Sequence, residues 1–186
     1  NQFKNKTTKD LDWTDQFSDY AIEKYTEGTN KDHRAYWLNE FKRPLGASIF
    51  PTDYHREAFR TFKSSRVDIA LGEDTVVEMK KYSSKNGISL YGFLIGAFNL
   101  FLNKLTSSED IVIGLSTATQ PAIGRNGLVG HMVNLIPLRV SVDPSLSLKD
   151  FLRNVRIKMM DAFDHQFYTY GTLVKELTNI QRNHSE

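Results

Sequence analysis

The sequence predicts a fold that combines α-helices with a mixed β-sheet, of the α/β or α+β class. Apolar runs of strand length, such as residues 110–116 and 132–140, lie between segments whose apolar residues recur at the spacing of a helix. The chain has 186 residues, which is enough for one sizeable core or two small ones.

The first part of the chain is polar and then helical. Residues 1–12 are rich in Lys, Asn and Thr, and we expect them to form a flexible lead-in to a folded part over residues 13–186. Apolar side chains at helical spacing predict helices over Phe17–Thr26 and Lys31–Phe41.

The middle of the chain predicts a strand followed by two helices. Apolar residues alternate over Lys63–Leu71, which is the period of a half-buried strand. Acidic residues come early and lysines late in Glu73–Tyr82, as the helix dipole favours, and Gly87 follows as a C-terminal glycine. The next helix, Leu90–Leu105, is apolar nearly all round, so we expect it to be buried on most sides.

The last part predicts two strands and two helices. The apolar run Asp110–Ser116 suits a strand that is covered on both faces, and the loop Thr117–Leu128 joins it to a second strand. A capping-box pattern at Ser147–Asp150 begins one helix, and Thr172–Ile180 predicts another. Three strands are few for burying such an apolar helix, so either a strand is missed or protein outside this chain completes the sheet.

An amide side chain interrupts the apolar face of the second strand. Met132, Ile136, Leu138 and Val140 share one face with Asn134, because side chains alternate across a strand. A buried amide without partners costs a few kcal/mol, roughly 1–3. We therefore expect Asn134 to be hydrogen-bonded to specific partners, of which neighbouring backbone is the simplest.

Composition narrows the class of protein. The formal charge of +2 is small and the basic residues do not cluster, so nothing favours nucleic acid as a partner. The sequence has no cysteine, its residues Asn1–Asp10 are polar and unlike the apolar core of a signal peptide, and its longest apolar stretch, Leu90–Leu102, is shorter than a membrane span. We expect a cytoplasmic domain without a membrane partner.

No catalytic set is visible from the residues alone. The histidines are far apart in sequence, no metal-ligand spacing occurs, and a metal site is not predicted. His33 and His55 are expected at the surface, and His131 at a strand boundary with an exposed ring. The pair His165–Gln166 ends a helix and precedes aromatic residues, which favours a cationic helix end with an aromatic plug over direct ligand contact.

Five segments, taken in order, resemble motifs of the condensation domain of nonribosomal peptide synthetases. Phe17–Ile22 resembles YxDYAxW, although Phe stands for the first Tyr and the final Trp is absent. The residues around Tyr36–Trp37 and Pro51–Asp53 resemble YW…L…LPTD. Asp110–Gly114 with Gly124–Arg125 resembles DxVIG…GR.

The two remaining motifs lie in the second half of the chain. Val129–Arg139 is similar to GxFVNTxPxR, with Met for Phe and Leu for Thr. His165–Gln166 resembles the start of HQDxPFE, but the residues after it differ from the usual ones. The GxFVNT-like strand followed by Pro137 and Arg139 favours a condensation-type member over an epimerisation-type one, whereas the altered HQDxPFE-like segment indicates a divergent subtype.

The resemblance implies a chloramphenicol-acetyltransferase-like lobe. The family's catalytic HHxxxDG motif has no counterpart in the sequence, so we expect the C-terminal subdomain, which pairs with an N-terminal lobe. Between the lobes runs a tunnel reached by the phosphopantetheine arms of donor and acceptor carrier proteins, and no cofactor is expected to bind this chain directly. Thr117–Leu128 is the candidate for a segment that crosses to the partner lobe.

The resemblance also implies site residues and a reaction. In the family, the amine of the acceptor attacks the donor thioester to form an amide, assisted by a histidine of the missing motif. No catalytic residue is expected in this chain. The tunnel or interface residues implied are Ser116, Arg125, Gly130, Asn134, Arg139 and Gln166.

Two other functions stay open. One is a non-catalytic module that binds carrier proteins or recruits another enzyme. The other is a free-standing acyltransferase that uses coenzyme A, which the absence of the HxxxDG histidine disfavours.

Overall fold

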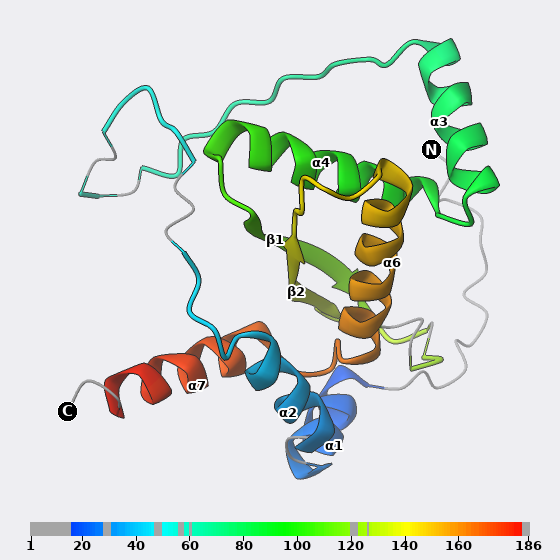
Figure 1. The fold of residues 1–186 in the computed structure, drawn as a ribbon. Coiled ribbons are helices and arrows are strands. Elements are labelled where there is room, and N and C mark those ends of the chain that lie inside the picture. Colours follow the sequence, from blue (N-terminus) through cyan, green and yellow to red (C-terminus); the bar gives the residue numbers. More distant parts are fainter. Residues whose placement is uncertain are drawn as a thin grey trace, which may run out of the picture. The chain divides into compact units, whose positions relative to one another are not determined.

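The computed structural model shows six helices and a two-stranded sheet in the part of the chain that it describes (Figure 1). That part comprises residues 16–27, 31–46, 50–55, 58–59, 61–119, 123–125 and 127–183. The chain divides into two compact units, which are described separately below. The lead-in predicted for residues 1–12 lies outside the described residues.

The first unit comprises residues 1–42, 114–136 and 165–186, as far as they are described. Its helices are α1 (Phe17–Glu27), α2 (Lys31–Glu40) and α7 (Tyr170–Asn183), and α2 packs against α7. The three helices match the predicted ones to within a few residues. The buried apolar side chains of this unit are Trp37, Leu115, Leu128, Met132, Ile136, Tyr168 and Leu173.

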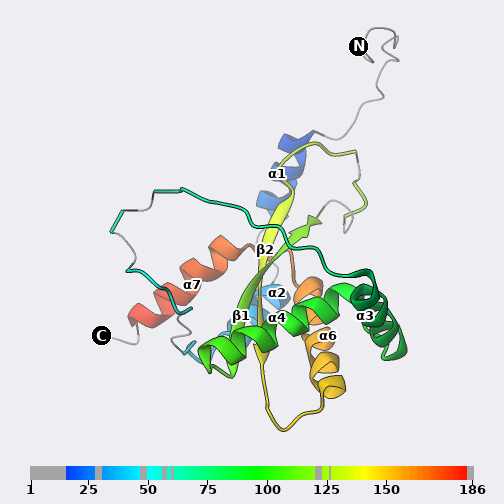
Figure 2. The same cartoon turned by 90° about the horizontal axis from the view of Figure 1, so that it is seen from above.

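The second unit comprises residues 43–113 and 137–164 and contains the longer helices. These are α3 (Glu73–Lys85), α4 (Leu90–Thr106) and α6 (Leu148–Asp164), with α4 packed against both others (Figure 2). The predicted caps are confirmed. The Ser89 hydroxyl accepts the Gly92 N–H at 3.0 Å, Gly87 adopts φ 64°, and the Ser147 hydroxyl accepts the Asp150 N–H at 3.2 Å.

A close contact explains the small residue in the middle of α4. A Cβ atom on Gly96 would overlap the Leu152 side chain, which α6 contributes to the core. The two helices therefore approach closely only because position 96 has no side chain.

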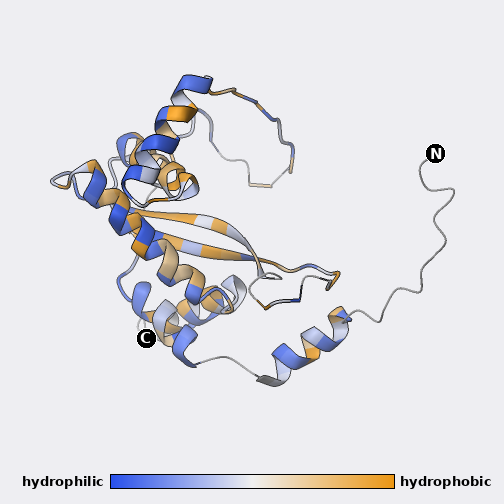
Figure 3. Cartoon of the chain, turned by 90° about the vertical axis from the view of Figure 1, so that its right-hand side faces the viewer, coloured by the Kyte–Doolittle hydropathy of each residue, from blue (hydrophilic) through white to orange (hydrophobic). Residues whose placement is uncertain are grey.

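The sheet consists of β1 (Asp110–Ala118) and β2 (Val133–Ser141), side by side and antiparallel (Figure 2). In the first unit Thr119 N–H donates to Met132 O at 2.9 Å, and in the second Val142 N–H donates to Glu109 O at 2.7 Å. Both strands are coloured mostly as hydrophobic in Figure 3. Each strand passes through both units, with the chain changing unit in the middle of the strand.

Burial along β1 corrects one prediction. Leu115 and Thr117 are buried, but Gly114, Ser116 and Ala118 are exposed, so this half of the strand is covered on one face only. The run Asp110–Ser116 suggested two covered faces, but it includes the small residues Gly114 and Ser116, which expose little apolar surface to solvent. The connection to β2 also lies further along the chain than expected, because β1 continues to Ala118 and β2 begins only at Val133.

The strand predicted over Lys63–Leu71 is wrong. Residues 61–72 form no strand, and Val67 and Ile69 are 83% and 85% exposed. Alternating apolar and polar residues give a strand one apolar face, but a strand also needs a neighbouring strand whose backbone pairs with its N–H and C=O groups. None of the described residues supplies one.

The expectation that Leu90–Leu105 is buried on most sides is also wrong. Its buried residues are Gly92, Gly96 and Asn99. Several large apolar side chains of α4 are exposed in the part of the chain that the structure describes, namely Tyr91, Leu94, Phe98, Phe101 and Leu105. Among the described residues, no helix taken alone meets the length and hydropathy of a membrane span, although α3 and α4 together do so across a bend of 105°.

Candidate functional site

Asn134 lies near the start of β2 and has specific partners, as predicted. Its Nδ2 donates to the carbonyl of Gln166 at 2.5 Å and approaches the carbonyl of Tyr168 at 3.5 Å. Its Oδ1 accepts the N–H of Leu135 at 2.9 Å. The half-buried amide is thus satisfied by backbone groups, and it fastens the turn that follows α6 to the strand.

The same turn is held from its other side by α2. The indole Nε1 of Trp37 donates to the carbonyl of His165 at 2.9 Å, and Trp37 itself is buried. Side chains from two separate elements therefore capture the carbonyls of the successive residues His165 and Gln166. We call residues 165–168 the tethered turn, because neutral side-chain donors fix its backbone at several points.

Aromatic rings pack around the tethered turn. The ring of Tyr36 stacks on His165 with a centroid distance of 3.9 Å and an angle of 12°, and His33 meets the same ring edge-on at 5.2 Å. Burial, and next the neighbouring His165, lower the pKa of His33, while Asp32 acts in the opposite direction. A lowered pKa favours a neutral His33 at neutral pH, which suits a ring packed against another imidazole.

The turn ends on a buried aromatic residue. Tyr168 is 6% exposed, whereas Phe167 is 38% exposed. Burial, and next the neighbouring carboxylate of Glu176, raise the pKa of Tyr168. The predicted aromatic plug is therefore confirmed for Tyr168.

Arg125 and Gly130 both contact α1. The guanidinium of Arg125 pairs with Glu23 at 2.7 Å and lies over the ring of Tyr20 at 5.8 Å. A Cβ on Gly130 would overlap the ring of Phe17, so only glycine allows this approach. The structure therefore places these two candidates on the connection that positions α1, within the first unit.

Ser116 lies on the exposed face of β1. Gly114 and Ala118 share this face, and Val133 and Leu135 continue it on β2 with 55% and 39% exposure. A Cβ on Gly114 would lie 3.0 Å from Leu135 Cδ1. We call these five residues the small-residue face, because three of its side chains are no larger than a hydroxymethyl group.

Arg139 lies in the second unit and is 7% exposed. Its Nε and Nη2 donate to the two carboxylate oxygens of Asp110 at 2.8 and 2.5 Å, and Nη1 donates to the carbonyl of Arg43 at 2.9 Å. Hydrogen bonding to Arg139 is the largest cause of a lowered pKa at Asp110, and Arg43 adds to it. The structure places Arg139 in a bidentate pair inside the unit.

The structure thus brings some candidates together and separates others. Asn134 and Gln166 meet at the tethered turn, and Arg125 and Gly130 meet at α1, whereas Arg139 belongs to the other unit. The sequence did not reveal the roles of Trp37 and Asp110. A buried arginine needs a carboxylate partner, so Arg139 indicated that such a partner exists. The sequence did not show that it is Asp110, because the two residues are 29 positions apart.

These residues can position other groups. Hydrogen bonds from Asn134 and Trp37 fix the backbone of the tethered turn, and the small-residue face offers a surface without large side chains. Among the residues that the structure describes, no group of three or more His, Asp or Glu side chains is arranged to hold a metal ion.

Comparison with known proteins identifies the family. The family model described as Condensation domain matches residues 1–186. The chain belongs to the condensation domain family. The resemblance of the sequence motifs is thereby confirmed, and the role of this family is peptide-bond formation.

The condensation-domain relatives are nonribosomal peptide synthetases of antibiotic and lipopeptide biosynthesis. Bacitracin synthase 2 of Bacillus licheniformis is 29% identical over 147 residues, which are 79% of this chain and 6% of that protein. Gramicidin S synthase 2 of Brevibacillus brevis is 32% identical over 149 residues, which are 80% of this chain and 3% of that protein. The chain therefore spans a small part of these relatives.

Solved structures show the same fold. A four-domain nonribosomal peptide synthetase bound to AMP and glycine has a TM-score of 0.79 at 23% identity, covering 85% of this chain and 12% of that one. The first condensation domain of the CDA synthetase has a TM-score of 0.71 at 21% identity, covering 85% and 35%. The X-domain in complex with OxyB from teicoplanin biosynthesis has a TM-score of 0.77 at 18% identity, covering 87% and 37%.

Proposed function

We propose that this chain is the C-terminal subdomain of a condensation domain and supplies one wall of its reaction tunnel. The observation that carries the proposal is the match of the condensation-domain family to every residue of the sequence. In this function an acceptor amine attacks the carbonyl of a donor thioester, the new C–N bond forms, and the thiol of the donor arm leaves. The reaction takes place in the cytoplasm.

The partners proposed are an N-terminal lobe and two carrier proteins. The assisting histidine belongs to the HHxxxDG motif, which this sequence lacks, so it comes from the N-terminal lobe. The phosphopantetheine arms stay attached to the donor and acceptor carriers throughout. This chain contributes shape and hydrogen bonds rather than a proton-transfer group.

The small-residue face supports a role as tunnel wall. Gly114, Ser116 and Ala118 leave room above the strand, while Val133 and Leu135 offer apolar contact beside them. A narrow arm that carries an acyl group needs a surface of this kind, because large side chains would occupy its path. In the proposal the tethered turn and Asn134 keep β2, and with it this face, in a fixed position.

A bulky residue on this face tests the proposal. Ser116→Trp in the intact synthetase is expected to lower formation of dipeptidyl carrier at least about tenfold, because the indole fills the path of the arm. Ser116 is exposed, so folding tolerates the change. Ser141→Trp, on an exposed residue at the far end of β2, is the matched control and is expected to remain near wild type.

The result that contradicts the tunnel wall is full activity of Ser116→Trp in a protein whose unfolding midpoint is unchanged. Equal losses in both tryptophan variants also contradict it. Mass spectrometry of the carrier-bound product gives the rate directly. The isolated chain is expected to be inactive, and amide formation by it alone overturns the assignment of the assisting histidine to another lobe.

A non-catalytic recruitment module is the second candidate. The observation that favours it is the similarity to the X-domain, whose solved complex contains OxyB. Substituting the second histidine of the HHxxxDG motif of the parent protein separates the candidates. A condensation domain loses product formation, whereas a recruitment module keeps its full effect on peptide output.

A further inference from the structure

Three aromatic side chains of α2 lie on one face of the helix and meet the tethered turn. His33 is followed by Tyr36 and Trp37 at the i+3 and i+4 positions, which are neighbours on a helix surface. Trp37 donates its indole N–H to the carbonyl of His165, and Tyr36 stacks on the His165 ring. His33 meets that ring edge-on, with 5.2 Å between the ring centroids. These contacts all lie within the first unit.

The two imidazoles give this contact a pair of groups that titrate near neutral pH. Neutral rings pack well edge-on, because the positive edge of one meets the negative face of the other. One proton is also tolerated, since a charged His165 would stack on the electron-rich ring of Tyr36. Two cations with 5.2 Å between their ring centroids repel each other. The contact therefore accepts a first proton and resists a second.

Burial adds to this resistance at His33. The ring is half-buried, its Nδ1 atom is shielded from solvent, and the ring of Phe167 lies 6.1 Å away between centroids. A proton on His33 would place a charge where little water reaches it. Burial, and next His165, lower the pKa of His33, in agreement with this geometry.

The other charged groups around His33 do not cancel the effect. On α2, Asp32 favours a charged His33, but it acts less strongly than burial and His165. Arg34 Nε donates to Glu176 Oε1 at 3.0 Å, so the carboxylate that α7 contributes is already engaged by a cation. Burial raises the pKa of Tyr168, so its hydroxyl stays uncharged near neutral pH.

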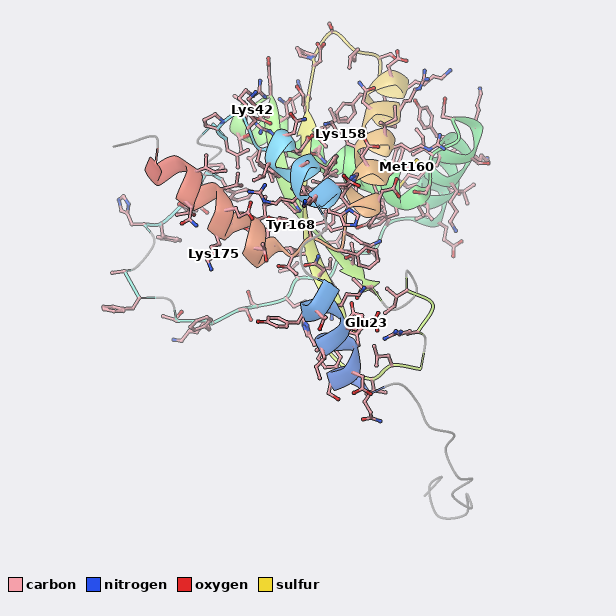
Figure 4. All side chains as sticks on the ribbon, turned by 90° about the horizontal axis from the view of Figure 1, so that it is seen from below. Glu23, Lys42, Lys158, Met160, Tyr168 and Lys175 are labelled. Atoms are coloured by element: carbon pink, nitrogen blue, oxygen red, sulfur yellow. The ribbon has the colours of Figure 1, made fainter. Side chains whose placement is uncertain are left out.

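The lysine of α7 lies on the far side of its helix. Lys175 follows the buried Leu173 by two residues, which places it about 200° around the helix axis. In Figure 4 its side chain extends from the side of α7 away from α2. Asp164, which precedes the tethered turn, is exposed. His165 is therefore the charged neighbour that decides how His33 titrates.

We propose that the His33–His165 pair is a proton-sensitive latch, which holds α2 on the tethered turn until both rings are charged and then releases it. Release frees the His165 carbonyl from Trp37, whereas Asn134 still holds the carbonyl of Gln166 from the strand. The latch thus loosens one of the two attachments of the turn. It depends on contacts within the first unit and not on the reaction proposed above.

The direction of the pH effect follows from the lowered pKa of His33. An unconstrained histidine has a pKa of about 6.5, so the docked state is favoured above that pH. Below it, the released helix takes up protons that the docked helix does not, and release becomes more favourable. A helix of 10 residues is marginal on its own, so release also exposes the backbone amides of α2 to exchange.

Hydrogen–deuterium exchange of the intact synthetase, read by mass spectrometry, tests the latch. Peptides over α2 are compared at about pH 7.5 and about pH 5.5, on either side of the pKa of free histidine, after correction for the intrinsic exchange rate. Protection of α2 is expected to fall at least about tenfold at the lower pH, while peptides over β2 stay within about twofold. His33→Phe keeps an aromatic ring that cannot be charged, and it is expected to abolish the difference. His131→Gln, at an exposed histidine of the first unit, is the matched control and is expected to retain it.

Equal protection of α2 at both pH values in the wild type overturns the proposal. A pH effect that persists in His33→Phe does the same, and His165→Phe, prepared in parallel, gives the answer if His33→Phe does not fold. Equal loss of protection in β2 shows general acid unfolding instead of a latch. An effect that appears only near about pH 4 assigns the change to carboxylates such as Glu176.

Discussion

Asn134 and Arg139 lie five residues apart in one strand and fix their surroundings in different ways. Asn134 is neutral and half-buried, and it holds the backbone of a turn. Arg139 is charged and 7% exposed, and it holds a carboxylate through two hydrogen bonds. The comparison shows that two polar residues of one motif need not share a role. Asn134 holds a turn on the side of β2 opposite the small-residue face, and Arg139 maintains the interior of its unit.

The largest loss of stability is expected when the Asp110–Arg139 pair is broken. Asp110→Ala leaves Arg139 buried without its carboxylate, so the free energy of unfolding is expected to fall by roughly 3 kcal/mol. Urea denaturation measures this change. Asp68→Ala is the matched control, because the Arg66–Asp68 pair is exposed on both sides and its loss should change stability little.

A double replacement sharpens the same prediction. Asp110→Leu with Arg139→Met removes both charges, and it is expected to be more stable than Asp110→Ala alone. If the double variant is less stable than Asp110→Ala, the unpaired charge of Arg139 is not the main reason why Asp110→Ala loses stability.

Acid is the next test of the pair. The pKa of Asp110 is lowered in the folded protein, so its contribution to stability is present above its unfolded pKa of about 4 and is lost as pH falls through the lower folded value. The stability difference between wild type and Asp110→Ala should therefore narrow as the pH falls from 5 towards 2. A difference that is constant over this range contradicts an ionic role for Asp110.

Asn134 is expected to have a smaller effect on stability and a larger one on function. Asn134→Ala leaves the carbonyls of Gln166 and Tyr168 without their side-chain donor, which should cost about 1–2 kcal/mol. Formation of dipeptidyl carrier by the intact synthetase should fall more than this loss of stability explains. Equal harm to folding and to condensation makes Asn134 a purely structural residue.

Gly114→Ala is the mildest change. The new methyl group would lie 3.0 Å from Leu135 Cδ1, and Leu135 is exposed enough to move aside. The free energy of unfolding should change by less than about 1 kcal/mol, because a less flexible unfolded chain offsets the contact. Thermal denaturation checks this, and a loss several times larger shows that the small-residue face is rigid.

Local patterns predicted most of the helices and the need for partners at Asn134. Capping by Ser89 and Ser147, and the glycine at position 87, depend on residues within one turn of the chain, so the sequence contains the whole signal. An amide among apolar neighbours likewise shows that it needs a partner without showing which one.

Interactions between distant segments could not be predicted in this way. The indole of Trp37 meets His165 across 128 residues, and the pattern of α2 shows only that Trp37 is buried. The strand predicted at Lys63–Leu71 failed for a related reason, since alternation does not supply a neighbouring strand. Long-range pairing decided both cases.

The most direct test compares the two polar residues in one assay. The rate of dipeptidyl-carrier formation is measured for Asn134→Ala and Arg139→Met in the intact synthetase, at a temperature where denaturation curves show both to be folded. The account predicts at least about a tenfold loss for Asn134→Ala and a rate near wild type for folded Arg139→Met. Equal losses, or the reverse order, contradict the separation of roles along β2.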